Sequence, residues 1–488
     1  KNQPIYYLIQ EEFFKEINKY EDWQNIEKNS YENYRLLTDL DFMGKTNINS
    51  NLKIGKLDTE GSKHKIKNVN IDFKEKNSYL GLIKECKYGI ENIIFENITL
   101  TFPDNVNMLG VIAKNSDVIN NVEFKNIILV GKGNIMGAIA YNTGKKVESI
   151  NLENINIENG KGEIGGLFGQ TLSGDAKNII ANNINIKASG DNVGGIIGKS
   201  ITDEIIIFEN AKISNSNIEG NINIGGLIGS GIITKNSYIN NCNIKGNQNI
   251  GGAVGYEGFF VIENLKVEYS TIEGNRTVGG LFGSNNGTIE NSTVIDSNIR
   301  GVSTEGAEIG GIAGISSQGI NKCNILNCNI TSVGKDVGGL IGSGMNSSRC
   351  YVLNSNVEGY SNVGGISGHA VIGNMNNSYS NANVIATEHT AGGILGYLEN
   401  GSNNNLAISQ IYNTYYAEGS IKSKTNVGGI IGKIETELYD TAIADYYRTM
   451  YIEANLISKD KSTISLGIGS NPEENGKIKD IAKRIDPP

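Results

Sequence analysis

Cysteine and histidine are the residue types in this chain that could bind a metal ion or act as nucleophiles, and their spacing decides between those roles. No C-x-x-C pair occurs, which argues against a zinc ribbon, and no H-E-x-x-H motif occurs, which argues against a catalytic zinc site of that type. We therefore predict no catalytic residue, no metal ligand and no cofactor-binding residue here. The cysteines and histidines are Cys86, Cys242, Cys323, Cys328, Cys350, His64, His369 and His389.

Other catalytic patterns are missing or have a simpler explanation. A G-x-S-x-G nucleophile motif does not occur between a strand and a helix. Glycine clusters recur without a following helix or Lys-Ser/Thr pair, so they are not phosphate-binding loops. Acidic residues fall at scattered outward positions, as at Glu91, Glu123, Glu153 and Glu290. We interpret them as a solvated face rather than as converging carboxylates.

The elements that would position these residues are defined by a repeated glycine phrase, aliphatic-Gly-Gly-x-x-Gly. Most copies are 26 to 31 residues apart, and weaker copies precede them at Gly81, Gly110 and Gly137. A fixed period of this length indicates a solenoid or another repeat architecture. The ten clear copies begin at Gly165, Gly194, Gly225, Gly251, Gly279, Gly310, Gly338, Gly364, Gly392 and Gly428.

A second pattern lies between the glycine phrases, with apolar or small residues at i, i+3, i+5, i+8 and i+10. A step of two places both side chains on one face of a strand, and a step of three skips a residue at a corner. Helical periodicity would give different steps. One repeat supplies Ile119, Val122, Phe124, Ile127 and Leu129.

These two patterns predict an all-β chain: a right-handed parallel β-helix of about 12–13 coils, with the glycine phrase and the two inward pairs forming three strands per coil. Equivalent inward residues should then stack in columns, such as Ser297, Cys328 and Ser355. Cys323 and Cys350 should be neighbours in adjacent coils, and we expect them to remain thiols that fill small inward positions. We attribute the glycines to positive φ angles or to close stacking of neighbouring backbones.

The two ends differ from the middle. Residues 1–35 are expected to form a helical N-terminal cap, because Leu8, Phe13, Phe14, Ile17 and Trp23 suit one or two short amphipathic helices. Residues 36–435 form the β-helix. Residues 436–488 are expected to be a helical C-terminal cap or a linker to a following domain, with helix at 439–456 and 475–485.

Composition limits the partners. The net charge is −9 with acidic and basic residues mixed along the chain, which argues against nucleic acid and against an anionic membrane surface. No apolar run is long enough for a membrane-spanning helix. We expect a monomer.

An enlarged loop is the predicted binding surface. The distance from a glycine phrase to the next inward position widens to 19 residues between Gly392 and Ile411. Insertions in solenoids gather on one face, which is often the binding face; a harmless surface loop is the equally weighted alternative. The candidate binding residues are Glu399, Asn400, Ser402, Asn403, Asn404 and Asn405.

The glycine phrases resemble the GLUG repeat of bacterial cell-surface proteins. The segments Tyr34–Phe42 and Lys63–Val69 are also similar to the opening of such proteins, and the whole chain resembles the N-terminal region of bacterial immunoglobulin A-specific zinc metalloendopeptidases. This resemblance implies a secreted or wall-attached protein whose zinc and catalytic residues lie in a separate C-terminal domain. No position here matches those residues, so the enzymatic status of this chain by itself is open.

Three functions follow from these observations. The first is a non-catalytic module that positions an antibody, a host protein, for a downstream protease domain of the same polypeptide. The second is an adhesin-type stalk that binds host glycans or matrix proteins. The third is a β-helical polysaccharide-degrading enzyme, which would require several carboxylates along one groove.

Overall fold

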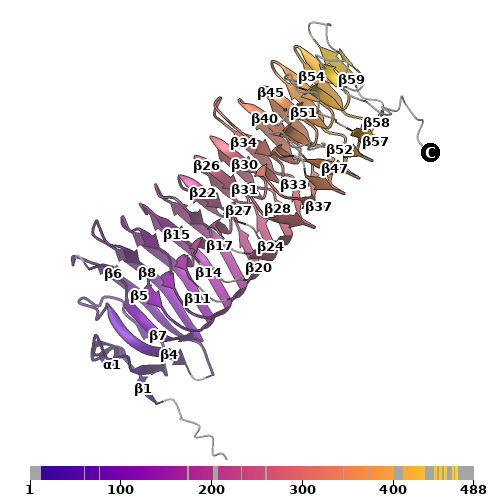
Figure 1. Cartoon of the computed structure of the whole chain (residues 1–488). Coiled ribbons are helices and arrows are strands. Elements are labelled where there is room, and N and C mark those ends of the chain that lie inside the picture. The colour runs from indigo at the N-terminus through magenta and orange to yellow at the C-terminus, as the bar shows by residue number, and fades with distance from the viewer. Residues whose placement is uncertain are drawn as a thin grey trace, which may run out of the picture.

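A computed structural model shows the chain as a long rod of stacked β coils (Figure 1). The expected parallel β-helix is confirmed. The structure describes residues 13–470 except 60, 76, 173–174, 202–206, 232, 259–260, 345, 372, 400–409, 435–444, 448–449, 453–454, 459–463 and 466–467. Nearly all described elements are strands, and neighbouring coils pair in parallel. The only helix in these residues is α1 (Tyr20–Gln24).

One repeat in the middle of the rod shows how a coil is built. It comprises β30 (Arg276–Gly279), β31 (Phe282–Asn285), β32 (Thr288–Glu290), β33 (Thr293–Ile295) and β34 (Asn298–Gly301). The β30 strand belongs to a 14-stranded sheet, and the other four belong to a 47-stranded sheet. Each strand bonds to its equivalent in the next coil.

The steps of three in the sequence pattern are corners at left-handed residues. Asn291 has φ 49° between β32 and β33, and Asp296 has φ 47° between β33 and β34. Asparagine and aspartate tolerate positive φ better than other non-glycine residues. In the first half of the rod the same corners lie within long strands such as β11 (Ile119–Val130), where Asn121 and Asn126 have φ 55° and 54°.

The glycine phrase is a corner between the two sheets rather than one strand, which corrects the predicted three-strand coil. β30 ends at Gly279 and β31 begins at Phe282. A Cβ on Gly279 would lie 1.9 Å from the carbonyl oxygen of Phe282, and one on Gly280 would lie 2.0 Å from the carbonyl oxygen of Gly311 in the next coil. Neither glycine has a positive φ. Close approach of backbones is therefore the reason for these glycines.

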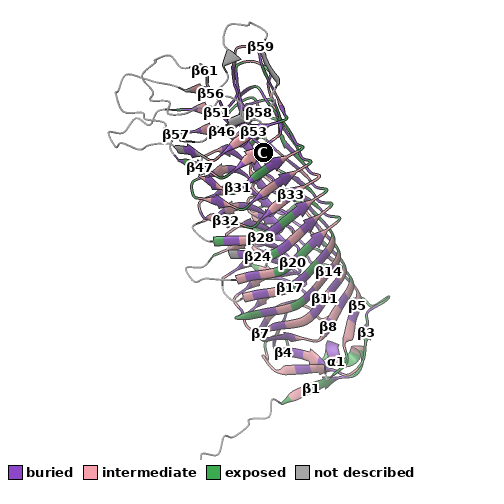
Figure 2. Ribbon diagram, turned by 90° about the vertical axis from the view of Figure 1, so that its right-hand side faces the viewer, coloured by how far each residue is buried: buried purple, intermediate pink, exposed green. Residues whose placement is uncertain are grey.

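The core consists of inward side chains stacked along the rod, and its buried residues are coloured purple in Figure 2. Its columns follow the predicted frame, since Asn298 aligns with Asn329 and Asn329 with Asn356. The backbone N–H of Cys328 donates to Ser355 Oγ in the next coil at 3.0 Å.

The N-terminal segment contains less helix than predicted. Phe14 and Ile17 lie in strand β1 (Phe14–Ile17), which pairs with β2 (Asn33–Leu36) and so extends the sheet. From residue 13 onward in this segment, helix is confined to α1, at the N-terminal end of the rod (Figure 1). Its Trp23 is fully buried, packs edge-on against Phe42 and donates to the carbonyl oxygen of Asn49 at 2.9 Å. Leu8 lies outside the described residues.

The expected helix at 439–456 is wrong for the residues that the structure describes there. Strands β57 (Asp445–Tyr447), β58 (Met450–Ile452) and β59 (Asn455–Ser458) continue the ladders of the preceding coil. β60 (Ile464–Ser465) and β61 (Ile468–Ser470) complete another coil, in which Ser465 occupies the position of a phrase glycine. The repeat therefore continues beyond residue 435, since β60 is still part of the 14-stranded sheet. The predicted helix at 475–485 lies outside the described residues.

The 14 strands of the smaller sheet mark the successive coils. They are β6 (Tyr79–Leu80), β9 (Met108–Leu109), β12 (Ile135–Met136), β15 (Glu163–Gly165), β18 (Val193–Gly194), β22 (Ile222–Gly225), β26 (Gln248–Gly251), β30, β35 (Ile309–Gly310), β40 (Lys335–Gly338), β45 (Ser361–Gly364), β50 (Thr390–Gly392), β55 (Asn426–Gly428) and β60.

Candidate functional site

The enlarged loop predicted as a binding surface begins directly after strand β51 (Leu395–Leu398). Of the six candidate residues, Glu399 is described, and Asn400, Ser402, Asn403, Asn404 and Asn405 lie outside the described residues. Glu399 is exposed, and its backbone N–H donates to the carbonyl oxygen of Ala370 in the preceding coil at 2.8 Å. The backbone at the start of the loop is therefore held by the stacked coils.

A polar and aromatic cluster surrounds this corner. Nε2 of His369 lies 2.9 Å from Oε2 of Glu399, and the His369 ring stacks on Tyr397 with centroids 5.5 Å apart. Lys433 from the following coil places its ammonium 5.5 Å from the centre of the Tyr397 ring, a distance at which a cation attracts an aromatic face. We call His369, Tyr397, Glu399 and Lys433 the insertion corner. It offers a carboxylate, an imidazole and a cation for contacting a polar partner.

The insertion corner arises from one column of the repeat. His369 aligns with Tyr397, and Tyr397 with Lys433, at the outward position between two inward residues. His389 is not part of this cluster, because its ring contacts Tyr360 edge-on in another part of the coil. The described residues contain no group of three or more His, Cys, Asp or Glu side chains that could hold a metal ion.

The cysteines lie in the interior. All five are buried free thiols. Cys323 and Cys350 are neighbours in adjacent coils, as the alignment of Asn324 with Tyr351 shows. Burial raises the pKa of Cys86 to about 12 and that of Cys350 to about 11. Since the thiolate is the reactive form, these cysteines are suited to packing rather than to nucleophilic chemistry.

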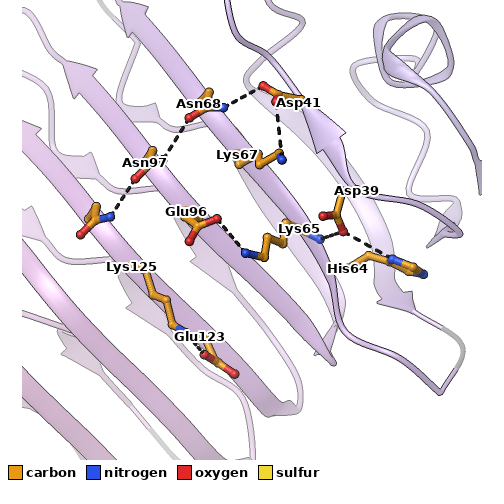
Figure 3. A network of polar contacts seen from close by, with 11 residues as sticks. Asp39, Asp41, His64, Lys65, Lys67, Asn68, Glu96, Asn97, Glu123 and Lys125 are labelled. Atoms are coloured by element: carbon orange, nitrogen blue, oxygen red, sulfur yellow. Dashed lines mark hydrogen bonds and ion pairs between the residues drawn. The ribbon is translucent and has the colours of Figure 1, made fainter.

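His64 lies near the N-terminal end of the rod. Its side chain is half-buried at the start of β5 (His64–Asp72), and Nδ1 lies 3.5 Å from Oδ1 of Asp39. The same Asp39 oxygen accepts a bond from the backbone N–H of Lys65 (Figure 3). His64 thus belongs to a surface network at the N-terminal end of the rod.

The acidic residues are ordered into ladders, which the sequence interpretation of scattered charges missed. Lys65 bonds Glu96 in the next coil at 3.0 Å, and Asn97 donates to Asn68 at 3.0 Å beside it (Figure 3). Burial alone would raise the pKa of Glu123, but hydrogen bonds and charge from Lys125 and Lys63 lower it to about 2. The sequence does contain a signal for these ladders, because lysine and glutamate alternate at intervals of about one repeat.

A second residue missed by the sequence interpretation is the buried carboxylate of Glu257, the last residue of β27 (Val254–Glu257). It is fully buried, its Oε2 has no hydrogen-bond partner among the residues that the structure describes, and its Oε1 accepts one bond from the backbone N–H of Gly258 at 3.2 Å. Burial raises the pKa of Glu257 to about 8. Its column carries Asn285 in the next coil. The sequence signal was a glutamate at a position where the next two coils place Asn285 and Ser316.

Known proteins show little similarity to this chain. No protein-family model matches the chain, and no curated protein matches it. No helix among the described residues is long and apolar enough to cross a membrane. One solved structure that matches is that of a candidate immunoglobulin A1 protease from Bacteroides ovatus, at 14% identity over 91% of this chain and 84% of that one. Its TM-score of 0.16 is too low for the superposition to inform on fold or function.

Proposed function

We propose that this chain is the non-catalytic β-helical module of a secreted or wall-attached bacterial immunoglobulin A-specific zinc metalloendopeptidase. In this proposal the module holds the antibody, and the zinc and catalytic residues belong to a separate domain of the polypeptide. The glycine phrases and the segment Tyr34–Phe42 support the proposal through their resemblance to that family.

The observation that carries the proposal is the unbroken stacking of coils from β2 to β61. Every described strand of the 14-stranded sheet pairs in parallel with the next, from β6 and β9 to β55 and β60. At about 4.8 Å per coil, this sheet alone spans about 60 Å. A rod of this kind fixes the distance and orientation of groups at its two ends, and fixed geometry is what a substrate-positioning module must provide.

The insertion corner is the part of the rod where we place antibody contact. It combines the exposed Glu399 with the ring of Tyr397 and the ammonium of Lys433, and it adjoins the longest polar insertion in the repeat. Aromatic and charged side chains held on a rigid frame are typical anchors of protein interfaces.

Binding of immunoglobulin A to the immobilised full chain tests the proposal, with immunoglobulin G as the control antibody. We expect saturable binding of immunoglobulin A, no binding of immunoglobulin G, and at least tenfold weaker binding after deletion of 400–405. Deletion of 202–204, a polar segment from an earlier repeat of the sequence, is the control and should leave affinity unchanged. Absence of immunoglobulin A binding by the intact chain would refute the proposal.

A further inference from the structure

The charge of the outward side chains on one flank of the rod changes along its length. In the first half, the outward positions of its strands carry charges, such as Lys65, Glu123 and Lys266. In the second half, the equivalent strands from β33 to β53 contain no charged side chain. These strands are β33, β38 (Asn324–Leu326), β43 (Tyr351–Leu353), β48 (Tyr379–Ser380) and β53 (Tyr415–Ala417), and we call their outward side chains the uncharged flank. Figure 1 labels β33, the first of these strands.

Three tyrosines occupy one outward column of the uncharged flank. Tyr351 aligns with Tyr379, and Tyr379 with Tyr415, so one tyrosine projects from each of three successive coils. Tyr351 is 43% exposed, and the other two are half-buried. A second outward column holds the half-buried aliphatic side chains of Ile295, Leu326 and Leu353, of which Leu353 shares a strand with Tyr351.

A column of asparagines borders the tyrosines across the next corner of each coil. Asn329 aligns with Asn356 and Asn356 with Asn383, and all three are exposed. Nδ2 of Asn383 donates to Oδ1 of Asn356 at 3.1 Å. An amide has two N–H donors and two acceptor lone pairs, so each amide keeps bonding capacity directed to solvent after this contact.

We propose that the uncharged flank binds a linear, neutral polysaccharide that lies along the rod with about one sugar residue per coil. A tyrosine offers an apolar ring face and a hydroxyl, which match the C–H face and the hydroxyl rim of a sugar ring. The asparagine amides supply donors and acceptors for further sugar hydroxyls. The strands themselves offer no charge to pair with a charged polymer.

The repetition of the flank identifies a polymer rather than a single sugar or a protein surface. Equivalent side chains recur at about 4.8 Å, the spacing of paired strands, and this is close to the advance of one sugar ring in an extended chain. A partner that uses Tyr351, Tyr379 and Tyr415 equally must repeat itself at the same interval. This inference goes beyond the proposed function, because it involves different residues from the insertion corner and a different ligand.

Affinity electrophoresis of the full chain in gels containing soluble polysaccharides tests the inference. The probes are barley mixed-linkage β-glucan and konjac glucomannan, which are neutral and extended, with dextran as a flexible neutral control and polygalacturonate as a charged control. The variant is the double substitution Tyr351→Ala with Tyr379→Ala. Tyr256→Ala, on another outward column of the coil, is the matched control variant. Circular dichroism confirms that each variant keeps its strand content.

We expect at least one extended neutral probe to retard the wild-type chain and the Tyr256→Ala variant, with at least a tenfold weaker affinity for the double variant. Dextran and polygalacturonate should leave migration unchanged. The inference is overturned if neither extended probe retards the chain, if the double variant binds as well as the wild type, or if polygalacturonate binds best. Concentration-dependent self-association in sedimentation that the double substitution abolishes would instead assign the flank to a second copy of this chain. These results are independent of the immunoglobulin A measurement.

Discussion

Replacing Glu257 with glutamine should stabilise the middle of the rod at neutral and alkaline pH. The carboxyl of Glu257 is fully buried, Oε2 has no partner, and no ion pair to it occurs among the described residues. Burial therefore favours the protonated form and raises the pKa from 4.5 to about 8. Glutamine has the same size and stays neutral at every pH.

The sign and size of the effect follow from the two pKa values. Below pH 4.5 the side chain is protonated in both the folded and the unfolded chain, so the burial of charge costs nothing. As the pH rises toward 8 the unfolded chain ionises first, and the folded coil loses stability until its own carboxyl ionises. One pKa unit corresponds to about 1.4 kcal/mol, so the loss at pH 7 is about 3 kcal/mol.

Hydrogen exchange read coil by coil is the suitable assay, because repeat proteins can open locally without unfolding as a whole. After correction for intrinsic exchange rates, amides of β27 and β31 in the wild type should lose protection between pH 5 and pH 8, and those of the Glu257→Gln variant should not. Glu263→Gln is the control, because Glu263 lies on the surface and pairs with Lys235 at 3.0 Å. Equal protection of wild type and Glu257→Gln at pH 8 would refute the reasoning.

Three further predictions address packing, thiol reactivity and the charged ladders. Gly280→Ala should destabilise its coil by about 3 kcal/mol or more, because overpacking costs about 1–3 kcal/mol and the added Cβ would clash with backbone here. Gly319→Ala is the control, because a Cβ there meets only Asn321 Nδ2 at 3.8 Å. It should leave the melting temperature unchanged. The five buried cysteines should react with Ellman's reagent at pH 8 only after unfolding, and rapid labelling of the native chain would contradict their raised pKa values. The lowered pKa of Glu123 contributes stability that is present above pH 4.5 and lost as the pH falls toward 2, so Glu123→Gln should reduce the stability of the first coils at pH 7 and leave it unchanged at pH 2 in hydrogen exchange.

The repeat could be predicted well from the sequence, because each coil has the same spacing of inward residues and glycines. Inward positions such as Ser297, Cys328 and Ser355 were placed in one column from spacing alone, and the structure confirms that column. The glycine phrase was located correctly but assigned to a strand, since its corner depends on contacts with the next coil that no single repeat reveals.

The ends and the surface were harder to predict. Phe14 and Ile17 suit a helix by periodicity, yet pairing of β1 with β2 outweighs that local preference. The C-terminal coil was missed because Ser465 replaces the expected glycine. The columns of the insertion corner and the uncharged flank join residues about one repeat apart, so they become visible only when the coils are aligned in register.

The parallel pairing of coils has a mechanical consequence. The hydrogen bonds between coils run along the axis of the rod, so tension applied between its two ends loads these bonds lengthwise and not in shear. Since each coil contacts mainly its two neighbours, the terminal coil has fewest bonds to break and should detach first. A chain under steady pull would then lengthen in steps of one coil, and each step would release roughly the same amount of polypeptide.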